Sequence, residues 1–295
     1  MLKRSLMFIH PAMLSLKNAQ LVVRKKELPD ETQTVAIEDI GLVMIDNPMV
    51  TMTIPLINAL ADHEVAVVFC NEKGMPNSML LSLSANNTQG ETLRHQLEAG
   101  EVLKKNLWKQ IVEAKIRNQA ALLKKLGKHG ELLKPLYSNV KSGDTDNREG
   151  IAAKIYWTEL FGKGFIRDRN LAGANTLLNY GYTVLRAAVA RALVCSGLFP
   201  ALGIFHRNRS NAYPLADDMI EPYRPFVDEV VYTLLVQGQT ELTTEVKGIL
   251  LKVLYCDTAF AKVTRPLSVG LSMTMASLAK CYAKQTSRLS LPVLQ

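Results

Sequence analysis

The sequence lacks closely spaced cysteines. Its four, Cys70, Cys195, Cys256 and Cys281, lie far apart, and no two have a Cys-x-x-Cys spacing. This spacing argues against a zinc site built on thiolates. Most of their neighbours are apolar, so we expect reduced, buried thiols in a cytoplasmic protein.

A secretory signal and an uninterrupted apolar span are also missing. Residues 1–4 lead directly into a strand-like run. The longest apolar stretch, 182–205, contains Arg186 and Arg191, which a membrane span would avoid. We therefore expect a buried helix with basic residues at its edge, and no membrane association.

The composition indicates a folded protein with an uneven charge. Apolar residues make up 48% of the 295 positions, which is enough for two domains with sizeable cores. The net charge of +8 divides into −2 for residues 1–90 and +10 for residues 91–295. The basic part is expected to meet a polyanion such as nucleic acid, although a solvated helical surface explains the same charge.

The pattern of apolar residues changes once along the chain and predicts an α+β fold. Residues 1–85 are β-rich, with a hairpin at 13–23 and one helix that begins near Thr53. Residues 86–92 are small and polar and predict a linker. Residues 93–295 have helical spacing, with breaks at 138–147, 162–173 and 200–213, and predict a larger all-α domain with a loose C-terminal tail.

Residues 104–134 form a basic helical stretch. Nine Lys or Arg residues oppose only Glu113 and Glu131. Lys104, Lys105, Lys109 and Lys115 can share one broad helix face that neutralises backbone phosphates without reading bases. A solvent-facing helix side is the plainer explanation.

Glu149 follows a helix entry at 143–148. Asp146 is a candidate cap, which would put Glu149 at the third helical position of a capping box. In that case its carboxylate only reaches back to a backbone N–H. The alternative is a functional carboxylate, since Ala152 and Ala153 leave room beside it.

His206 ends an apolar run and opens a basic loop. Arg207 and Arg209 suit phosphate oxygens and would disfavour protonation of the imidazole, which leaves it free as a ligand. A lone histidine is more commonly a structural residue, and both interpretations stay open here.

A second acidic group follows Pro214, which predicts the start of a helix. Asp217 and Asp218 each have a spacing that allows a shared face with Glu221. Pro222 ends or kinks the helix and can direct Glu221 at a site; a solvated acidic turn is the alternative. Two carboxylates and one imidazole would suit Mg²⁺ or Mn²⁺, which activate a phosphodiester.

Several ordered segments together resemble the CRISPR-associated adaptation integrase family, the CRISPR-associated protein one family. They are residues 142–150, 178–186, 203–206 and 215–228. Residues 15–18 and 46–48 resemble the versions that accompany single-effector (type II) systems. The resemblance runs in order over nearly the whole chain.

This resemblance implies a β-rich dimerisation domain at 1–85 and an α-helical catalytic domain at 93–295. It implies that Glu149, His206 and Glu221 are the catalytic and metal-binding residues, with Asp218 as a fourth candidate. The implied partners are double-stranded DNA (a spacer fragment and the repeat array), a second copy of the chain in a homodimer, and a small ferredoxin-like second CRISPR-associated protein.

The implied function is that of a metal-dependent DNA endonuclease and integrase. It inserts short foreign DNA as new spacers when a 3′-hydroxyl attacks a phosphodiester, with Mg²⁺ or Mn²⁺ as cofactor. One alternative is a general metal-dependent nuclease on branched DNA, with water as the nucleophile. A non-catalytic basic scaffold that binds nucleic acid is the second alternative.

Overall fold

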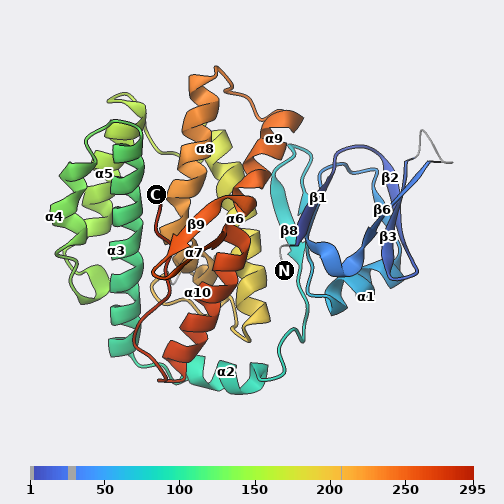
Figure 1. Ribbon diagram of the computed structural model, residues 1–295, viewed down its shortest axis with the longest axis horizontal. Coiled ribbons are helices and arrows are strands. Elements are labelled where there is room, and N and C mark those ends of the chain that lie inside the picture. Colours follow the sequence, from blue (N-terminus) through green and yellow to red (C-terminus); the bar gives the residue numbers. More distant parts are fainter. Residues whose placement is uncertain (1–2, 26–30, 207) are drawn as a thin grey trace. The chain divides into compact units, whose positions relative to one another are not determined.

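The computed structural model describes residues 3–25, 31–206 and 208–295. The chain forms two compact units, Met1–Asn87 and Thr88–Gln295, each with its own core (Figure 1). The division falls inside the predicted linker 86–92, but residues 89–92 belong to a helix, α2 (Gln89–Leu97). Arg207, which the sequence assigned to phosphate contact, lies outside the described residues.

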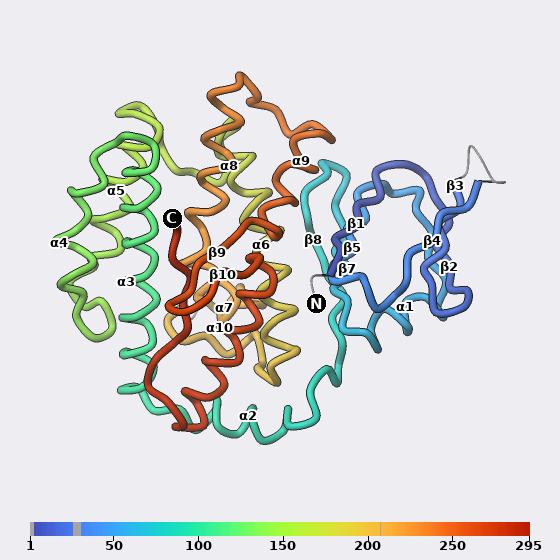
Figure 2. The backbone as a smooth tube through the Cα atoms, viewed as in Figure 1, coloured from blue at the N-terminus to red at the C-terminus, as the bar shows by residue number. Residues whose placement is uncertain are grey.

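The first unit contains two four-stranded sheets (Figure 2). One has the order β1-β5-β7-β8, in which β1, β5 and β7 are parallel and β8 is antiparallel; the other has the order β4-β3-β2-β6. The strands are β1 (Arg4–Phe8), β2 (Ala12–Lys17), β3 (Gln20–Lys25), β4 (Thr32–Ala36), β5 (Ile40–Ile45), β6 (Thr51–Met52), β7 (Ala66–Cys70) and β8 (Pro76–Leu80).

The predicted hairpin is formed by β2 and β3. Lys17 pairs with Gln20, and the two residues between them, Asn18 and Ala19, both have positive φ. That backbone twist matches the right-handed twist of paired strands. Inward-facing residues of both sheets then share one core with α1 (Ile54–Asp62).

The second unit is mainly helical. Its α-helices are α2, α3 (Glu101–Lys125), α4 (Lys134–Tyr137), α5 (Arg148–Phe161), α6 (Ala174–Cys195), α7 (Pro214–Ile220), α8 (Arg224–Val236), α9 (Thr244–Leu251) and α10 (Leu267–Tyr282). The three predicted helix breaks separate α4 from α5, α5 from α6, and α6 from α7. Short 3₁₀ turns lie at Ile37–Asp39 in the first unit and at Gly130–Leu133, Ser142–Asp144, Glu221–Tyr223 and Lys252–Tyr255 in the second.

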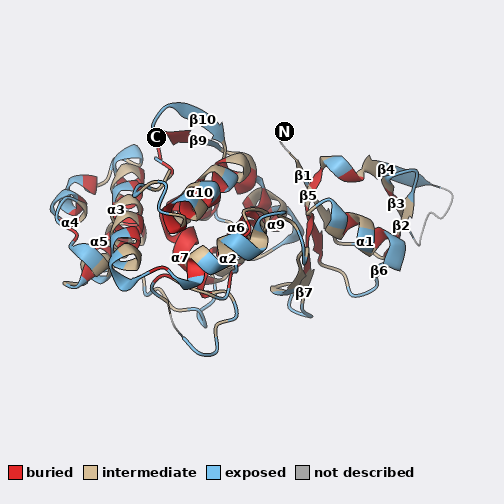
Figure 3. Cartoon of the chain, turned by 90° about the horizontal axis from the view of Figure 1, so that it is seen from below, coloured by how far each residue is buried: buried red, intermediate tan, exposed pale blue. Residues whose placement is uncertain are grey.

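The helical core forms around α6 and α7, and Figure 3 shows α7 almost entirely in the colour of buried residues. Close packing of α6 on α8 depends on Gly181, since a Cβ there would lie 2.4 Å from Val227 Cγ1. Within the described residues, no helix has both the length and the apolar character needed to cross a bilayer. The basic residues of 182–205, Arg186 and Arg191, both lie in α6, which packs in this core.

The prediction of an all-α second domain was wrong in one detail. Strands β9 (Asp257–Phe260) and β10 (Val263–Pro266) form an antiparallel hairpin before α10. The two strands are only four residues long, and each directly adjoins residues of helical spacing, so the apolar period did not reveal them. Phe260 packs against Gly270 of α10, where a Cβ would lie 2.5 Å from its ring.

The C-terminal segment is not a loose tail, contrary to the sequence prediction. Val293 donates its backbone N–H to Ala259 O at 2.8 Å, and the side chain of Leu294 is buried. Asn118 of α3, itself buried, donates to Pro222 O and Pro292 O and accepts from the backbone N–H of Leu294. The segment thus runs along α3 and is held by specific hydrogen bonds.

We expect Asn118→Ala to lower the free energy of unfolding by about 3 kcal/mol, because it removes three buried hydrogen bonds and leaves their partners unsatisfied. Urea denaturation followed by circular dichroism measures this loss. The exposed Asn139, whose side chain donates to Pro135 O at the surface, provides the matched control Asn139→Ala. Equal losses in the two variants would contradict the role assigned to Asn118.

Candidate active site

Two of the three candidate residues meet on one ammonium group. Lys115 Nζ of α3 lies 2.6 Å from Glu149 Oε1 of α5 and 2.5 Å from Glu221 Oε2, which follows α7. Glu149 and Glu221 are 72 positions apart in sequence, and α3 supplies the cation between them. Folding therefore brings two carboxylates into contact with a single positive charge.

Glu149 is not part of a capping box. The N-cap of α5 is Asn147, whose side chain accepts from Gly150 N, and the Asp144 carboxylate accepts the backbone N–H groups of Arg148 and Glu149. Asp146, the predicted cap, instead binds Arg148 Nε at 2.9 Å. The carboxylate of Glu149 is consequently free to face Lys115 rather than its own backbone.

Glu221 lies at the point where α7 ends. The helix starts at Pro214, as predicted, and Pro222 interrupts it, so that Glu221 begins a 3₁₀ turn before α8. Burial by itself would raise the pKa of Glu221, but the charges of Arg224 and Lys115 outweigh it and lower the pKa to about 2. Arg224 Nε lies 2.8 Å from Glu221 Oε1, so both carboxylate oxygens face a cation.

Lys115 corrects the predicted phosphate face. It is buried, and although burial lowers its pKa, the carboxylates of Glu221 and Glu149 raise it to a net value above the ordinary one. Lys104 and Lys109 remain near the surface but are paired with Glu101 and Glu113, at 3.9 and 3.7 Å. The spacing along the helix grouped Lys115 with these residues, because spacing does not show whether a given side chain points into the protein or toward solvent.

His206 is fixed by Asp218. The ring Nδ1 lies 2.6 Å from Asp218 Oδ1, and the same carboxylate accepts the backbone N–H groups of Ile204, Phe205 and His206. The hydrogen bond to Asp218 raises the pKa of His206 above its ordinary value; burial opposes this, and the charges of Glu221 and Glu149 add to it. With Nδ1 facing Asp218, Nε2 is the ring nitrogen left for a ligand or proton.

Both oxygens of Asp218 have partners: Oδ1 contacts the imidazole, and Oδ2 accepts the backbone N–H of Ile204. Its side chain is fully buried, which distinguishes it from Glu149 and His206. The tight loop before it requires Gly203, because a Cβ at that position would lie 2.5 Å from His206 O and 3.1 Å from Asp218 Oδ2. Close packing thus fixes the backbone of His206 as well as its ring.

A polar pocket of about 290 Å³ connects these groups. His206, Glu221 and Lys115 line it together, and Glu149 reaches it through Lys115. Its further polar lining is Gln119, Arg167, Arg169, Tyr182, Arg224 and Asp228, and Ala153 and Trp157 complete it. Of the predicted site residues, Glu221 and His206 line this pocket and Glu149 contacts it through Lys115, whereas the contact of Lys115 with both glutamates was not predicted.

A buried network forms the floor of this pocket. Tyr156 donates to Asp228 Oδ2 at 2.7 Å, and Tyr182 donates to Asp228 Oδ1. Burial raises the pKa of Asp228 to about 6, although the two tyrosine hydrogen bonds lower it in part. The guanidinium of Arg224 lies 4.4 Å from the ring centre of Tyr182, which links this network to Glu221.

The types of donor atom at this site suit a divalent cation, but the side chains are not at present arranged around a metal position. Within the described ranges, no three His, Cys, Asp or Glu side chains are grouped so that they could hold a metal ion. The Lys115 ammonium lies between the two glutamates instead. Glu221 Oε2 is buried and makes no hydrogen bond of regular geometry, so its strongest contact is a cation. Oxygen and imidazole donors around a cationic position suit Mg²⁺ or Mn²⁺.

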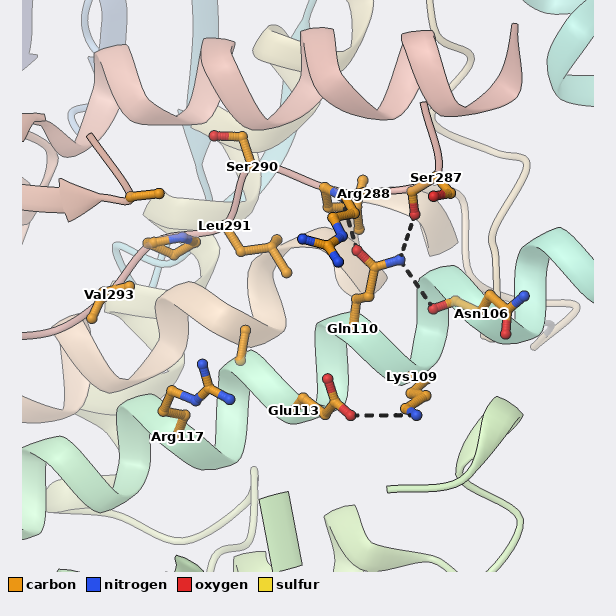
Figure 4. Close-up of a pocket in the computed structure, with 14 residues that line it drawn as sticks. Asn106, Lys109, Gln110, Glu113, Arg117, Ser287, Arg288, Ser290, Leu291 and Val293 are labelled. Atoms are coloured by element: carbon orange, nitrogen blue, oxygen red, sulfur yellow. Dashed lines mark hydrogen bonds and ion pairs between the residues drawn. The ribbon is translucent and has the colours of Figure 1, made fainter. Parts of the chain in front are cut away.

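A larger cavity, of about 680 Å³, lies between α3 and residues 287–293. Figure 4 shows Gln110 in it, which donates to Ser287 O and Asn106 O, and Glu113 paired with Lys109. Its lining contains one carboxylate and no imidazole. The smaller pocket is therefore the better candidate site, because it brings carboxylates and an imidazole together.

Solved structures share this fold. The chain superimposes on a casposase bound to integration product with a TM-score of 0.79, at 22% identity, over 98% of this chain and 93% of that one. A Cas6-RT-Cas1–Cas2 complex matches with a TM-score of 0.76, at 22% identity, over 99% of this chain and 36% of that one. The class is thus a β-rich unit followed by a helical unit, as in these proteins.

Sequence comparison defines the family. The model of the CRISPR associated protein Cas1 family matches residues 6–255. The CRISPR-associated endonuclease Cas1 of Neisseria meningitidis serogroup C (strain 8013) is 43% identical over 256 residues, which are 85% of this chain and 83% of that protein. The chain belongs to the Cas1 family.

We expect Asp218→Asn to lower the pKa of His206, because the variant loses the negative charge that stabilises the imidazolium. Proton NMR titration of the metal-free protein measures this pKa, with the His206 signal assigned by its absence in His206→Gln. Asp217→Asn is the control, since Asp217 pairs with Arg186 rather than with His206. A His206 pKa that is unchanged in Asp218→Asn would show that another group sets it.

Proposed function

We propose that this chain is a metal-dependent DNA integrase and endonuclease of CRISPR adaptation. It would join the 3′-hydroxyl of a short DNA fragment to a phosphodiester of the repeat array. In this transesterification the 3′-oxygen forms a new bond to phosphorus, and the former 3′-oxygen of the array strand leaves with a proton. The observation that carries the proposal is that Glu149 and Glu221 both contact Lys115 at a pocket that Lys115, Glu221 and His206 line together.

Glu149, Glu221 and His206 are the residues that would hold Mg²⁺ or Mn²⁺. When bound, such an ion lowers the pKa of the attacking hydroxyl and stabilises charge on the phosphate. Arg224 holds Glu221 in place at 2.8 Å, and Asp218 orients the imidazole. Glu221 and His206 are thus each held by a neighbouring side chain, and Lys115 would have to give way for a metal ion to reach both glutamates.

The comparisons support the choice of DNA and of a partner. A casposase, a similar fold, is solved with an integration product, and another similar chain is solved in a complex with Cas2. For this chain we propose double-stranded DNA, a homodimer through the first unit, and a small ferredoxin-like second CRISPR-associated protein. Two copies would provide the two reactions that insertion of a fragment requires.

Glu149→Ala, His206→Ala or Glu221→Ala should each lower fragment joining by roughly 100-fold or more and leave fragment binding largely intact. The assay incubates the protein and its partner with a 3′-hydroxyl fragment and a plasmid that carries the repeat. Glu113→Ala removes a carboxylate from α3 outside the pocket and should join normally. Equal loss of binding and joining would refute the assigned role, and nicking without joined product in the wild type would favour the nuclease alternative.

Lys115→Met should increase the response to divalent ions. The variant leaves Glu149 and Glu221 without their shared cation, so a bound ion would relieve repulsion that the ammonium now balances. We expect Mn²⁺ to half-saturate this variant at an about tenfold lower concentration, as read from the thermal midpoint. The exposed Lys124→Met is the control. If Mn²⁺ shifts the thermal midpoint of Lys115→Met by the same amount and at the same concentration as those of Lys124→Met and the wild type, the two glutamates do not bind the ion.

A further inference from the structure

Arg167 is a partly buried cation in the candidate pocket, and it forms no direct ion pair with a carboxylate in the part of the chain that the structure describes. Within the described residues, no Asp or Glu oxygen lies within 4.0 Å of its guanidinium. The neighbouring cations differ, since Lys115 contacts two glutamates and Arg224 contacts one. A partly buried guanidinium with no carboxylate in contact is costly. Burial lowers the pKa of Arg167, and the charge of Asp228, which lines the same pocket, only partly opposes this shift.

The position of this guanidinium is nevertheless fixed. Its Nη1 donates to Asn175 Oδ1 at 2.9 Å and its Nη2 donates to Asn179 Oδ1 at 2.8 Å. The same two asparagines donate to the backbone carbonyls of Ile166 and Arg169, which ties the loop before α6 to that helix. Two neutral acceptors therefore hold the fork without cancelling its charge.

The remaining donors face a suitable ligand site. An arginine has five N–H groups, and two of those of Arg167 are used by the asparagines. Arg167 lines the same pocket as His206 and Glu221, and the exposed Arg169 lies beside it. A planar, fixed fork with donors to spare matches the geometry of phosphate oxygens.

We propose that Arg167 binds a DNA backbone phosphate in this pocket and so positions the strand beside Glu221 and His206. The assignment rests on the proposed function for the identity of the ligand as DNA. Arg167 is a positioning residue in this role, and a phosphate of the DNA strand would supply the negative partner in contact with its guanidinium. Phosphate binding would also be independent of base sequence.

The test measures binding of a duplex fragment to the full-length, metal-free protein at increasing salt concentrations. Arg167→Gln should weaken binding about tenfold at low salt and make the slope of log affinity against log salt shallower by about 0.9. Arg167→Lys keeps the charge and should retain most of the slope. The matched control is Arg265→Gln of β10, which removes the same charge at an exposed position outside the pocket.

A second measurement separates a phosphate site from a structural role. Inorganic phosphate should raise the thermal midpoint of the wild type and of Arg265→Gln, and raise that of Arg167→Gln less. If the salt slope of DNA binding is unchanged in Arg167→Gln, the proposal is overturned. This holds even if inorganic phosphate no longer raises the thermal midpoint of the variant, because the site would then bind free phosphate but not DNA. If the wild type binds DNA but never joins it, the proposed function is overturned. The binding test of Arg167 can still be interpreted in that case, because it does not depend on joining.

Discussion

The site depends on the ammonium of Lys115 shared by Glu149 and Glu221. Two carboxylates taken out of water near each other repel, and each loses its hydration. The ammonium from α3 compensates for both, so the arrangement persists only while α3, α5 and the turn after α7 remain packed together. Removing any one of these three side chains would leave an uncompensated charge, so the electrostatic balance of the site depends on the packing of these elements.

The same balance extends outward through paired polar groups. Arg224 contacts Glu221 and lies over the ring of Tyr182, and Tyr182 and Tyr156 both donate to Asp228. Asp218 repeats this arrangement on the other side, where one buried carboxylate fixes an imidazole and three backbone N–H groups. The candidate site residues Glu221 and His206 are thereby held by neighbouring side chains, which limits their freedom before a ligand binds.

Much of this could be predicted from sequence where the signal is local. Pro214 and Pro222 act on their own backbone, so the start of α7 and its end before Glu221 were predicted correctly. The cap of α5 was assigned to Asp146, but Asp144, Asp146 and Asn147 can all cap a helix. The structure shows that the side chains of Asn147 and Asp144 accept the first backbone N–H groups of the helix. The inward direction of Lys115 and the anchoring of Leu294 to Asn118 depend on distant contacts, which no local pattern encodes.

Charge balance also connects the proposed metal site and the proposed phosphate site. Lys115, Arg167, Arg169 and Arg224 outnumber the carboxylates of Glu149, Glu221 and Asp228 around the pocket. A divalent cation alone would add positive charge to this excess, whereas a DNA phosphate would offset it. Each ligand therefore lowers the electrostatic cost of binding the other, and by linkage the coupling is reciprocal. A pocket of this charge should favour the cation and the strand together over either one alone.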